Sequence, residues 1–195
     1  MLTVHHLRAS QSERIVWLCE ELGVPYELKC YDREPSMAAP PQYKALYAFG
    51  TAPVITDGDL TLGESGAIVE YICNRHGGGR LILGPDHADY VDYLFWFHFA
   101  NGSLLPAMMV DHITAASGGV PAGPRPSRSD RALAMIEDRL GEAAYFAGEE
   151  FTAADIMMAL PRFGERRDLS GNPNIRAYLE RIAARPAWKR TAEFR

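Results

Sequence analysis

The sequence predicts a chain of two parts, an α/β segment followed by an all-helical segment. Strand-like runs occur mainly before residue 76, whereas apolar residues further along recur with helical spacing. A glycine-rich passage, His76-Gly77-Gly78-Gly79-Arg80, separates the two patterns. We therefore expect domains at residues 1–76 and 87–195, joined by a linker at residues 77–86. A chain of 195 residues can bury roughly 70% of its unfolded surface, which is enough for a stable core.

The first elements predict two parallel strands joined by a helix. Residues 2–6 form a short β-prone run, and residues 26–31 alternate like a second strand. Between them, residues 15–22 place apolar side chains at the i, i+3, i+4, i+7 positions of a helix, which Gly23 ends. This order favours parallel pairing through a right-handed crossover.

The rest of the first segment predicts a short helix, a hairpin and a further helix. Residues 42–47 are expected to be helical. Residues 54–56 and 60–62 flank the turn Asp57-Gly58-Asp59 and predict an antiparallel hairpin. Helical spacing returns at residues 66–76. The expected order is β-α-β-α-β-β-α.

The second segment is predicted to be helical throughout. A long helix is expected at residues 88–116, weakened or kinked by Gly102 and Pro106. An irregular connection follows at residues 117–126. Further helices are expected at residues 127–145, 152–163 and 173–184, and around Trp188.

Composition narrows the classes of function. The net charge of -5 argues against a nucleic-acid partner. The longest apolar stretch, residues 93–100, is interrupted by His98 and is far shorter than the ~20 residues of a membrane span, so we expect no membrane partner and a cytoplasmic location. The three cysteines, Cys19, Cys30 and Cys73, show neither a CxxC pattern nor metal-ligand spacing. No disulfide and no metal are expected.

Thr152 and Asp155 predict a capped helix start. Thr152 at the N-cap and Asp155 at N3 match a capping box, and Phe151 and Ile156 flank it like a hydrophobic staple. Losing such a cap typically costs ~1 kcal/mol of stability. We therefore assign Thr152 and Asp155 a structural role.

The step from Ala52 to Pro53 has two interpretations. A proline at the first position of a strand usually marks an edge or a special turn, because it cannot donate to the ladder. Alternatively, a cis bond before Pro53 would leave the backbone N–H and C=O of Ala52 free to pair with an extended peptide. The sequence does not distinguish the two.

Glu64 and Ser65 precede a predicted helix and also have two interpretations. Acid and serine residues commonly cap helices. The same position favours an anion, because backbone N–H groups and the helix dipole converge there. In that case Ser65 would bind a carboxylate and Glu64 an ammonium group.

Taken together, these features resemble the cytosolic glutathione transferase family. The resemblance rests on the element order, the Ala52-Pro53 step, the Glu64-Ser65 pair and the all-helical second half. It extends to Ser10-Gln11-Ser12-Glu13-Arg14 and Phe151-Thr152-Ala153-Ala154-Asp155-Ile156. The stretch of residues 127–187 is similar to the ending of bacterial members, so the chain resembles a bacterial serine-type member.

The resemblance implies a thioredoxin-like N-terminal domain with glutathione as co-substrate and no metal. Ser65 would take the γ-glutamyl carboxylate and Glu64 the ammonium group. The cysteinyl backbone would pair with Ala52, next to Pro53, like an added strand.

The glycyl end of glutathione has a different expected partner in this sequence. Similar bacterial sequences tend to carry a lysine where this chain has Thr51. The resemblance therefore implies that Gln42 or Lys44 contacts the glycyl carboxylate instead.

Ser10 is the catalytic residue that the resemblance implies. It occupies the position of the active hydroxyl or thiol, where it would stabilise the thiolate of glutathione. Ser12 is an alternative, because both serines precede the helical run. Arg14 is expected to tether the helix to the second domain. His5 and His6 lie in a predicted strand, where histidines usually pack or face solvent, and neither is expected to be catalytic.

The family also implies partners and competing activities. A small hydrophobic electrophile would bind between the domains, against the apolar side chains Trp96, Phe99 and Met108 together with His112. A homodimer is implied. The leading hypothesis is a glutathione transferase. The alternatives are a glutathione-dependent disulfide or peroxide reductase, and a non-catalytic binding or regulatory protein on the same scaffold.

Overall fold

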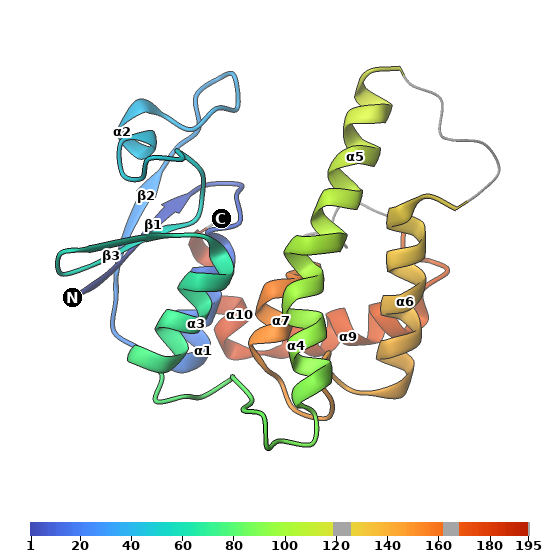
Figure 1. Cartoon of the computed structure of the whole chain (residues 1–195). Coiled ribbons are helices and arrows are strands. Elements are labelled where there is room, and N and C mark those ends of the chain that lie inside the picture. Colours follow the sequence, from blue (N-terminus) through green and yellow to red (C-terminus); the bar gives the residue numbers. More distant parts are fainter. Residues whose placement is uncertain (119–125, 162–167, 195) are drawn as a thin grey trace. The chain divides into compact units, whose positions relative to one another are not determined.

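The structure is a computed structural model that describes residues 1–118, 126–161 and 168–194. It confirms a thioredoxin-like α/β segment followed by a helical segment (Figure 1). By packing, the chain divides into two compact units. The first comprises Met1–Ile82 and the chain from Ala183 onward, and the second comprises Leu83–Ile182. The end of the chain thus packs with the N-terminal unit, while the domain boundaries expected from the sequence remain a prediction.

A four-stranded sheet of order β2-β1-β3-β4 forms the centre of the first unit. β1 (Leu2–Leu7) pairs in parallel with β2 (Glu27–Tyr31) and antiparallel with β3 (Val54–Asp57). β3 continues into the antiparallel hairpin with β4 (Leu60–Gly63). Both the parallel pair and the hairpin are therefore confirmed.

The side chains of β1 alternate between the two faces of the sheet, and the pairing with β2 and β3 sets their neighbours. Val4 stands opposite Leu28 in β2 and Ile55 in β3. Because side chains alternate along a strand, His5 and His6 point to opposite faces of the sheet. The two neighbouring histidines therefore meet different partners.

Helices lie against both faces of this sheet (Figure 1). α1 (Glu13–Leu22) and α3 (Ser65–Arg75) pack together, and α1 ends at Gly23, whose left-handed φ of 62° closes the helix. α2 (Pro41–Lys44) contributes Tyr43 to the apolar cluster on the other face. α2 is shorter than the predicted residues 42–47.

The chain after α2 turns back toward β4. At Gly63 a Cβ atom would lie 2.5 Å from the ring of Tyr47, so only glycine fits beside that ring. This contact holds Tyr47 against the end of β4 and gives a physical reason for the early end of α2.

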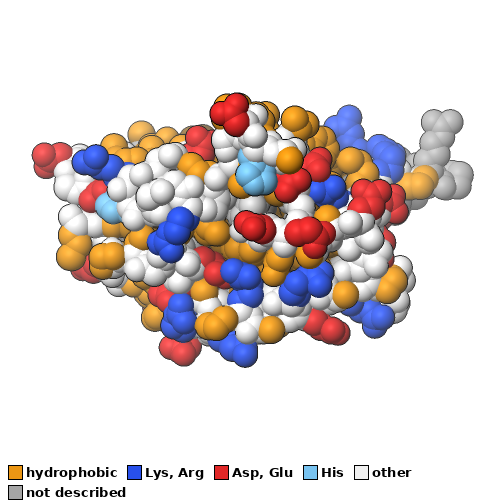
Figure 2. Space-filling view, turned by 90° about the horizontal axis from the view of Figure 1, so that it is seen from below, with side chains coloured by type: hydrophobic (Ala, Val, Ile, Leu, Met, Phe, Trp, Pro, Cys, Tyr) orange, Lys and Arg blue, Asp and Glu red, His pale blue; other side chains and the backbone are white. Residues whose placement is uncertain are grey.

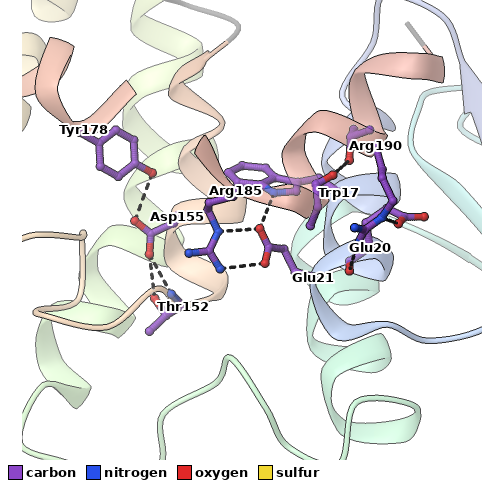
Figure 3. A network of polar contacts seen from close by, with 10 residues as sticks. Trp17, Glu20, Glu21, Thr152, Asp155, Tyr178, Arg185 and Arg190 are labelled. Atoms are coloured by element: carbon purple, nitrogen blue, oxygen red, sulfur yellow. Dashed lines mark hydrogen bonds and ion pairs between the residues drawn. The ribbon is translucent and has the colours of Figure 1, made fainter. Parts of the chain in front are cut away.

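The C-terminal helix packs on α1 within the first unit (Figure 3). The helix is α10 (Pro186–Thr191), and its Trp188 ring meets Trp17 edge to face at 4.7 Å. Arg185 donates to both carboxylate oxygens of Glu21, at 2.7 and 2.8 Å. Paired bonds of this kind fix orientation as well as adding energy.

The described part of the second unit is helical. It contains α4 (Tyr90–Phe99), the π-helical turn η1 (Ala100–Leu104), α5 (Leu105–Ala116), α6 (Arg128–Glu142), α7 (Ala153–Met158) and α9 (Pro173–Ala184). The predicted long helix is present as α4, η1 and α5, which follow one another directly. Its α-helical geometry changes to π-helical at η1, which contains Gly102 and precedes Pro106. A π turn absorbs the backbone irregularity that glycine and proline introduce.

α7 is shorter than the helix predicted for residues 152–163. It ends at Met158 because Ala159 adopts a left-handed φ of 47°. The rest of the predicted helix reaches beyond Pro161, outside the described residues. Most of the predicted connection at residues 117–126 also lies outside them.

The predicted capping box is confirmed at the start of α7 (Figure 3). The buried Asp155 carboxylate accepts from Thr152 N at 2.9 Å, Phe146 N at 3.2 Å and the Tyr178 hydroxyl at 3.1 Å. Thr152 Oγ1 in turn accepts from Ala154 N at 3.3 Å. Asp155 thereby joins the start of α7, the segment before it and α9.

Asp155 should make stability depend on pH. Burial raises the pKa of this carboxyl from 3.8 to about 6, despite the donors around it. Between these two pKa values the folded chain holds a proton that the unfolded chain releases. The contribution of the protonated Asp155 carboxyl to the free energy of unfolding is therefore complete below about pH 4 and is lost as pH rises through about 6. Asp155→Asn cannot titrate. Denaturant unfolding should show the wild-type advantage over this variant shrinking by up to about 3 kcal/mol across that window.

Asp138→Asn is the matched control, because Asp138 is an exposed carboxylate on α6. It should leave the pH dependence of unfolding as in the wild type. A wild-type advantage over Asp155→Asn that grows with pH would mean that the donors hold the carboxylate ionised, contrary to this prediction.

Candidate functional site

Ser10 lies in the turn between β1 and α1. Its side chain is half-buried, and its Oγ donates to the Leu7 carbonyl oxygen at 2.7 Å and accepts from Ser12 N at 3.1 Å. Ala9 before it has a left-handed φ of 53°, which bends the chain away from the strand. The hydroxyl therefore sits just before the N-terminus of α1, where a helix favours negative charge.

Ser12 is the buried member of the serine pair. Its Oγ lies 2.8 Å from Ser10 Oγ, accepts from Leu7 N at 3.0 Å and lies 2.9 Å from His6 Nδ1. Ser12 is at the N-cap position of α1, yet its side chain makes no capping hydrogen bond and turns back toward β1. With no exposed surface, Ser12 is a poorer candidate than Ser10 for contact with a ligand.

The bond between Ala52 and Pro53 is cis. This settles the alternative that the sequence left open. The pairing of β3 with β1 and β4 begins at Val54, so Ala52 precedes the paired part of the strand. Ala52 itself is half-buried beside the cluster of Leu7 and Val54.

Gln42 and Lys44 are exposed in and at the end of α2. The aliphatic stem of Lys44 runs past Gly50, with Cγ 3.7 Å from the place of a Cβ there. This packing brings Lys44 to the loop that leads to Ala52. Gln42 shares the short helix, and its contact with a ligand stays a prediction.

Glu64 and Ser65 start α3 in different ways. Glu64 is exposed at the N-cap with φ 66° and ψ 114°, and its side chain makes no capping bond. Ser65 is buried, and its Oγ accepts from Arg14 Nη1 at 3.3 Å. Simple capping therefore does not explain the pair. A non-glycine residue held at positive φ costs of order 1–3 kcal/mol, and such strain is concentrated at functional sites.

Arg14 and His6 join this group of residues, and the sequence analysis placed neither there. Burial lowers the pKa of Arg14 to about 10, so the guanidinium stays charged at neutral pH behind Ser65. The contact with Ser65 lies within the first unit, and the expected tether to the second domain stays a prediction. The alternation along β1 was the signal that could have placed His6 on the face toward α1.

The four residues expected to line a hydrophobic pocket lie on α4 and α5 of the second unit. Trp96 is buried, and its ring meets those of Phe146 and Phe99 at 5.1 and 5.2 Å. Phe99 and Met108 are half-buried, and His112 is exposed. Trp96 therefore belongs to an aromatic core, and the pocket stays a prediction.

Within the described residues, no helix is long and apolar enough to cross a membrane. The same residues contain no group of three or more His, Cys, Asp or Glu side chains able to hold a metal ion. On the face seen in Figure 2, acidic and basic side chains are interspersed with hydrophobic ones.

Comparison with known proteins identifies the class that this fold and site define. Residues 10–75 match the family model for the glutathione S-transferase N-terminal domain, and residues 126–181 match that for the C-terminal domain. Glutathione S-transferase 3 of Schizosaccharomyces pombe is 36% identical, over 99% of this chain and 87% of its own length. The chain belongs to the glutathione S-transferase family, and its curated relatives are named as transferase enzymes.

Solved structures agree with this assignment. A glutathione S-transferase from Actinobacillus pleuropneumoniae superposes with a TM-score of 0.83 at 31% identity, over 99% of this chain and 92% of that one. A theta class enzyme from Xanthomonas axonopodis pv. citri, solved with glutathione bound, gives 0.77 at 24% identity, over 97% and 96%. The second comparison supports the fold alone.

The backbone of Glu64 leads to a stability prediction. Glu64→Gly should raise the free energy of unfolding by up to about 1 kcal/mol, because glycine adopts φ 66° without strain but is more flexible when unfolded. Denaturant unfolding measures the change. Glu70→Gly, on the exposed side of α3, is the control and should lower the same quantity by about 1 kcal/mol. Equal losses in the two variants would contradict strain at Glu64.

Proposed function

We propose that the first unit binds glutathione and that Ser10 stabilises its thiolate for attack on a small hydrophobic electrophile. The observation that carries this proposal is the half-buried Ser10 hydroxyl at the N-terminus of α1. Near neutral pH only ~3% of a free thiol with a pKa near 8.5 is ionised. A hydroxyl donor and a helix N-terminus both favour the thiolate, and a pKa lower by two units corresponds to about 2.7 kcal/mol.

The γ-glutamyl end of glutathione fits the start of α3. Its carboxylate would accept from Ser65 and from backbone N–H groups in the first turn of the helix, with the charged Arg14 behind them. Its ammonium group would meet the exposed carboxylate of Glu64. The strained backbone of Glu64 supports this role, because it presents the side chain at the helix start.

The middle and the glycyl end of glutathione fit the loop before β3. The cysteinyl backbone would pair with Ala52, beside Pro53, as an extra strand ahead of the paired region. The glycyl carboxylate would meet Lys44, whose stem already packs against Gly50, or Gln42. Lys44 thus takes the place of a lysine at position 51.

The transferase hypothesis is favoured over a disulfide reductase that uses a protein thiol. Residue 10 is a serine, and Cys19 and Cys73 are buried, with pKa values raised chiefly by that burial. The exposed Cys30 lies in β2 and not in the turn that carries Ser10. A buried thiol of raised pKa is a poor nucleophile. From family resemblance we further propose a serine-type enzyme that resembles bacterial members and a homodimeric assembly. We propose a cytoplasmic location from the apolar pattern of the sequence.

Ser10→Ala should lower kcat by roughly ten- to a hundredfold, because a hydrogen bond to a charged sulfur is lost. The Kd of glutathione, measured by calorimetry, should change little. Turnover is measured over halides, epoxides, peroxides and disulfides, so that the same panel separates transferase from reductase activity.

Ser36→Ala is the matched control for this experiment. Ser36 is an exposed loop serine of the same unit, whose Oγ accepts only weakly from Ala38 N at 3.4 Å. Its kcat should equal that of the wild type. Equal kcat in Ser10→Ala would remove Ser10 from the mechanism, and no glutathione binding by the wild type would favour a non-catalytic scaffold.

A further inference from the structure

A chain of hydrogen bonds connects Ser10 with the buried ring of His6. Ser10 Oγ lies 2.8 Å from Ser12 Oγ, which lies 2.9 Å from His6 Nδ1. Ser12 has no exposed surface and His6 is 2% exposed. A hydroxyl at the edge of the candidate site is thus linked to an imidazole inside the first unit.

The second ring nitrogen of His6 fixes where the imidazole carries its proton. His6 Nε2 lies 3.1 Å from the carbonyl oxygen of Phe194. Because a carbonyl oxygen only accepts, Nε2 carries the hydrogen, and Nδ1 of the neutral ring is left as an acceptor. Ser12 is therefore able to donate its hydroxyl proton to His6, and Ser10 to donate to Ser12.

The Leu7 carbonyl oxygen offers both hydroxyls a second acceptor. It lies 2.7 Å from Ser10 Oγ and 3.1 Å from Ser12 Oγ. Leu7 N also donates to Ser12 Oγ at 3.0 Å. The end of β1 thus holds both serine oxygens in place while their protons can change direction.

The acceptor at Phe194 is held by the end of the chain. Phe194 ends the short 3-10 turn η2 (Ala192–Phe194), and its carbonyl oxygen also accepts from Arg8 Nη1 at 3.3 Å. The turn follows α10 directly, and α10 is bound to α1 by the ion pair of Arg190 with Glu20 (Figure 3). A fixed acceptor keeps His6 in one tautomer.

We propose that His6 receives the thiol proton of glutathione through Ser10 and Ser12, an inference that rests on the proposed function. The sulfur–hydrogen bond breaks as Ser10 Oγ takes the proton. Ser10 passes its own proton to Ser12, and Ser12 passes its own to His6 Nδ1. The products are a thiolate, two neutral serines and an imidazolium. When the conjugate leaves, the proton returns along the same path to solvent.

This transfer needs help from the surroundings, because an imidazole in water is roughly a hundredfold weaker base than a thiolate. After the transfer every donor points the same way, from His6 to Ser12, from Ser12 to Ser10, and from Ser10 to the sulfur. Hydrogen bonds to ionised groups are the stronger ones, and the N-terminus of α1 favours the thiolate.

The charged groups on the segments around His6 carry both signs. They are Arg8 in the turn after β1, Glu13 and Arg14 in the first turn of α1, and Glu193 in η2. Among the described residues of these segments, the two cations balance the two carboxylates.

His6→Asn tests His6 as a positioning and proton-accepting residue. The asparagine oxygen takes roughly the place of Nδ1, so Ser12 keeps an acceptor, but the amide does not take up a proton. We expect an unchanged Kd for glutathione and a kcat at neutral pH lower by tenfold or more. The deficit should vanish at alkaline pH, where the thiol ionises without a relay. Thiolate ultraviolet absorbance should show that bound glutathione ionises about one pH unit higher than in the wild type.

His5→Asn is the matched control, and Ser12→Ala is the second test. His5 is 4% exposed and bonds Tyr31 and Thr56 on the other face of the sheet, so its variant shares the burial but not the relay. Its pH–rate profile should follow that of the wild type. Ser12→Ala breaks the relay in the middle and should repeat the pH-dependent deficit.

The outcomes separate the relay from the proposed function. A loss of kcat in His6→Asn that is equal at every pH, or no loss of kcat, overturns the relay. In either case glutathione binding by the wild type still supports the proposed function. No binding by the wild type overturns both. Nitrogen NMR of the labelled imidazole tests the relay without ligand, because a neutral ring protonated at Nδ1 would overturn it and one protonated at Nε2 is expected.

Discussion

The connection between β1 and α1 depends on the buried hydroxyl of Ser12. Its oxygen is bound to the backbone of Leu7 and to His6, so the end of the central strand and the start of the first helix are tied at one atom. A buried hydroxyl is costly unless its bonds are made, and here several partners converge on it. These bonds hold the turn that carries Ser10 in shape, so the half-buried hydroxyl of Ser10 lies beside the buried hydroxyl of Ser12.

Much of the fold could be predicted because periodicity and turn chemistry act locally. Gly23 ends α1, Asp57-Gly58 forms the hairpin turn, and Thr152 with Asp155 starts α7, all as the residues themselves require. The boundaries that differed depend on contacts distant in sequence. The early end of α2 accompanies the ring of Tyr47 lying against Gly63, and the end of α7 follows the backbone of Ala159, which no side-chain preference signals.

The residues of the candidate site also fall into two groups, those that the sequence could single out and those that it could not. Ala52-Pro53 and Glu64-Ser65 stand out as short motifs, so the sequence could single them out, although only the structure shows the cis bond and the positive φ of Glu64. The alternation along β1 could place His6 on a face of the sheet, but the partners of Arg14 and His6 could not be predicted, because their contacts join residues on different elements. The sequence favours Trp96 for a pocket, although an aromatic residue at helical spacing is more often part of a core, and its neighbours place it in the core.

The packing of the segment from Ala183 onward with the first unit has a consequence for when that unit can finish folding. The first compact unit includes the segment from Ala183 onward, with Arg185 on Glu21 and the Phe194 carbonyl beside His6. Domains generally fold as they emerge from the ribosome, N-terminal first. This unit cannot be completed until the segment from Ala183 onward has been synthesised, so the nascent sheet waits, with α1 partly uncovered, for α10.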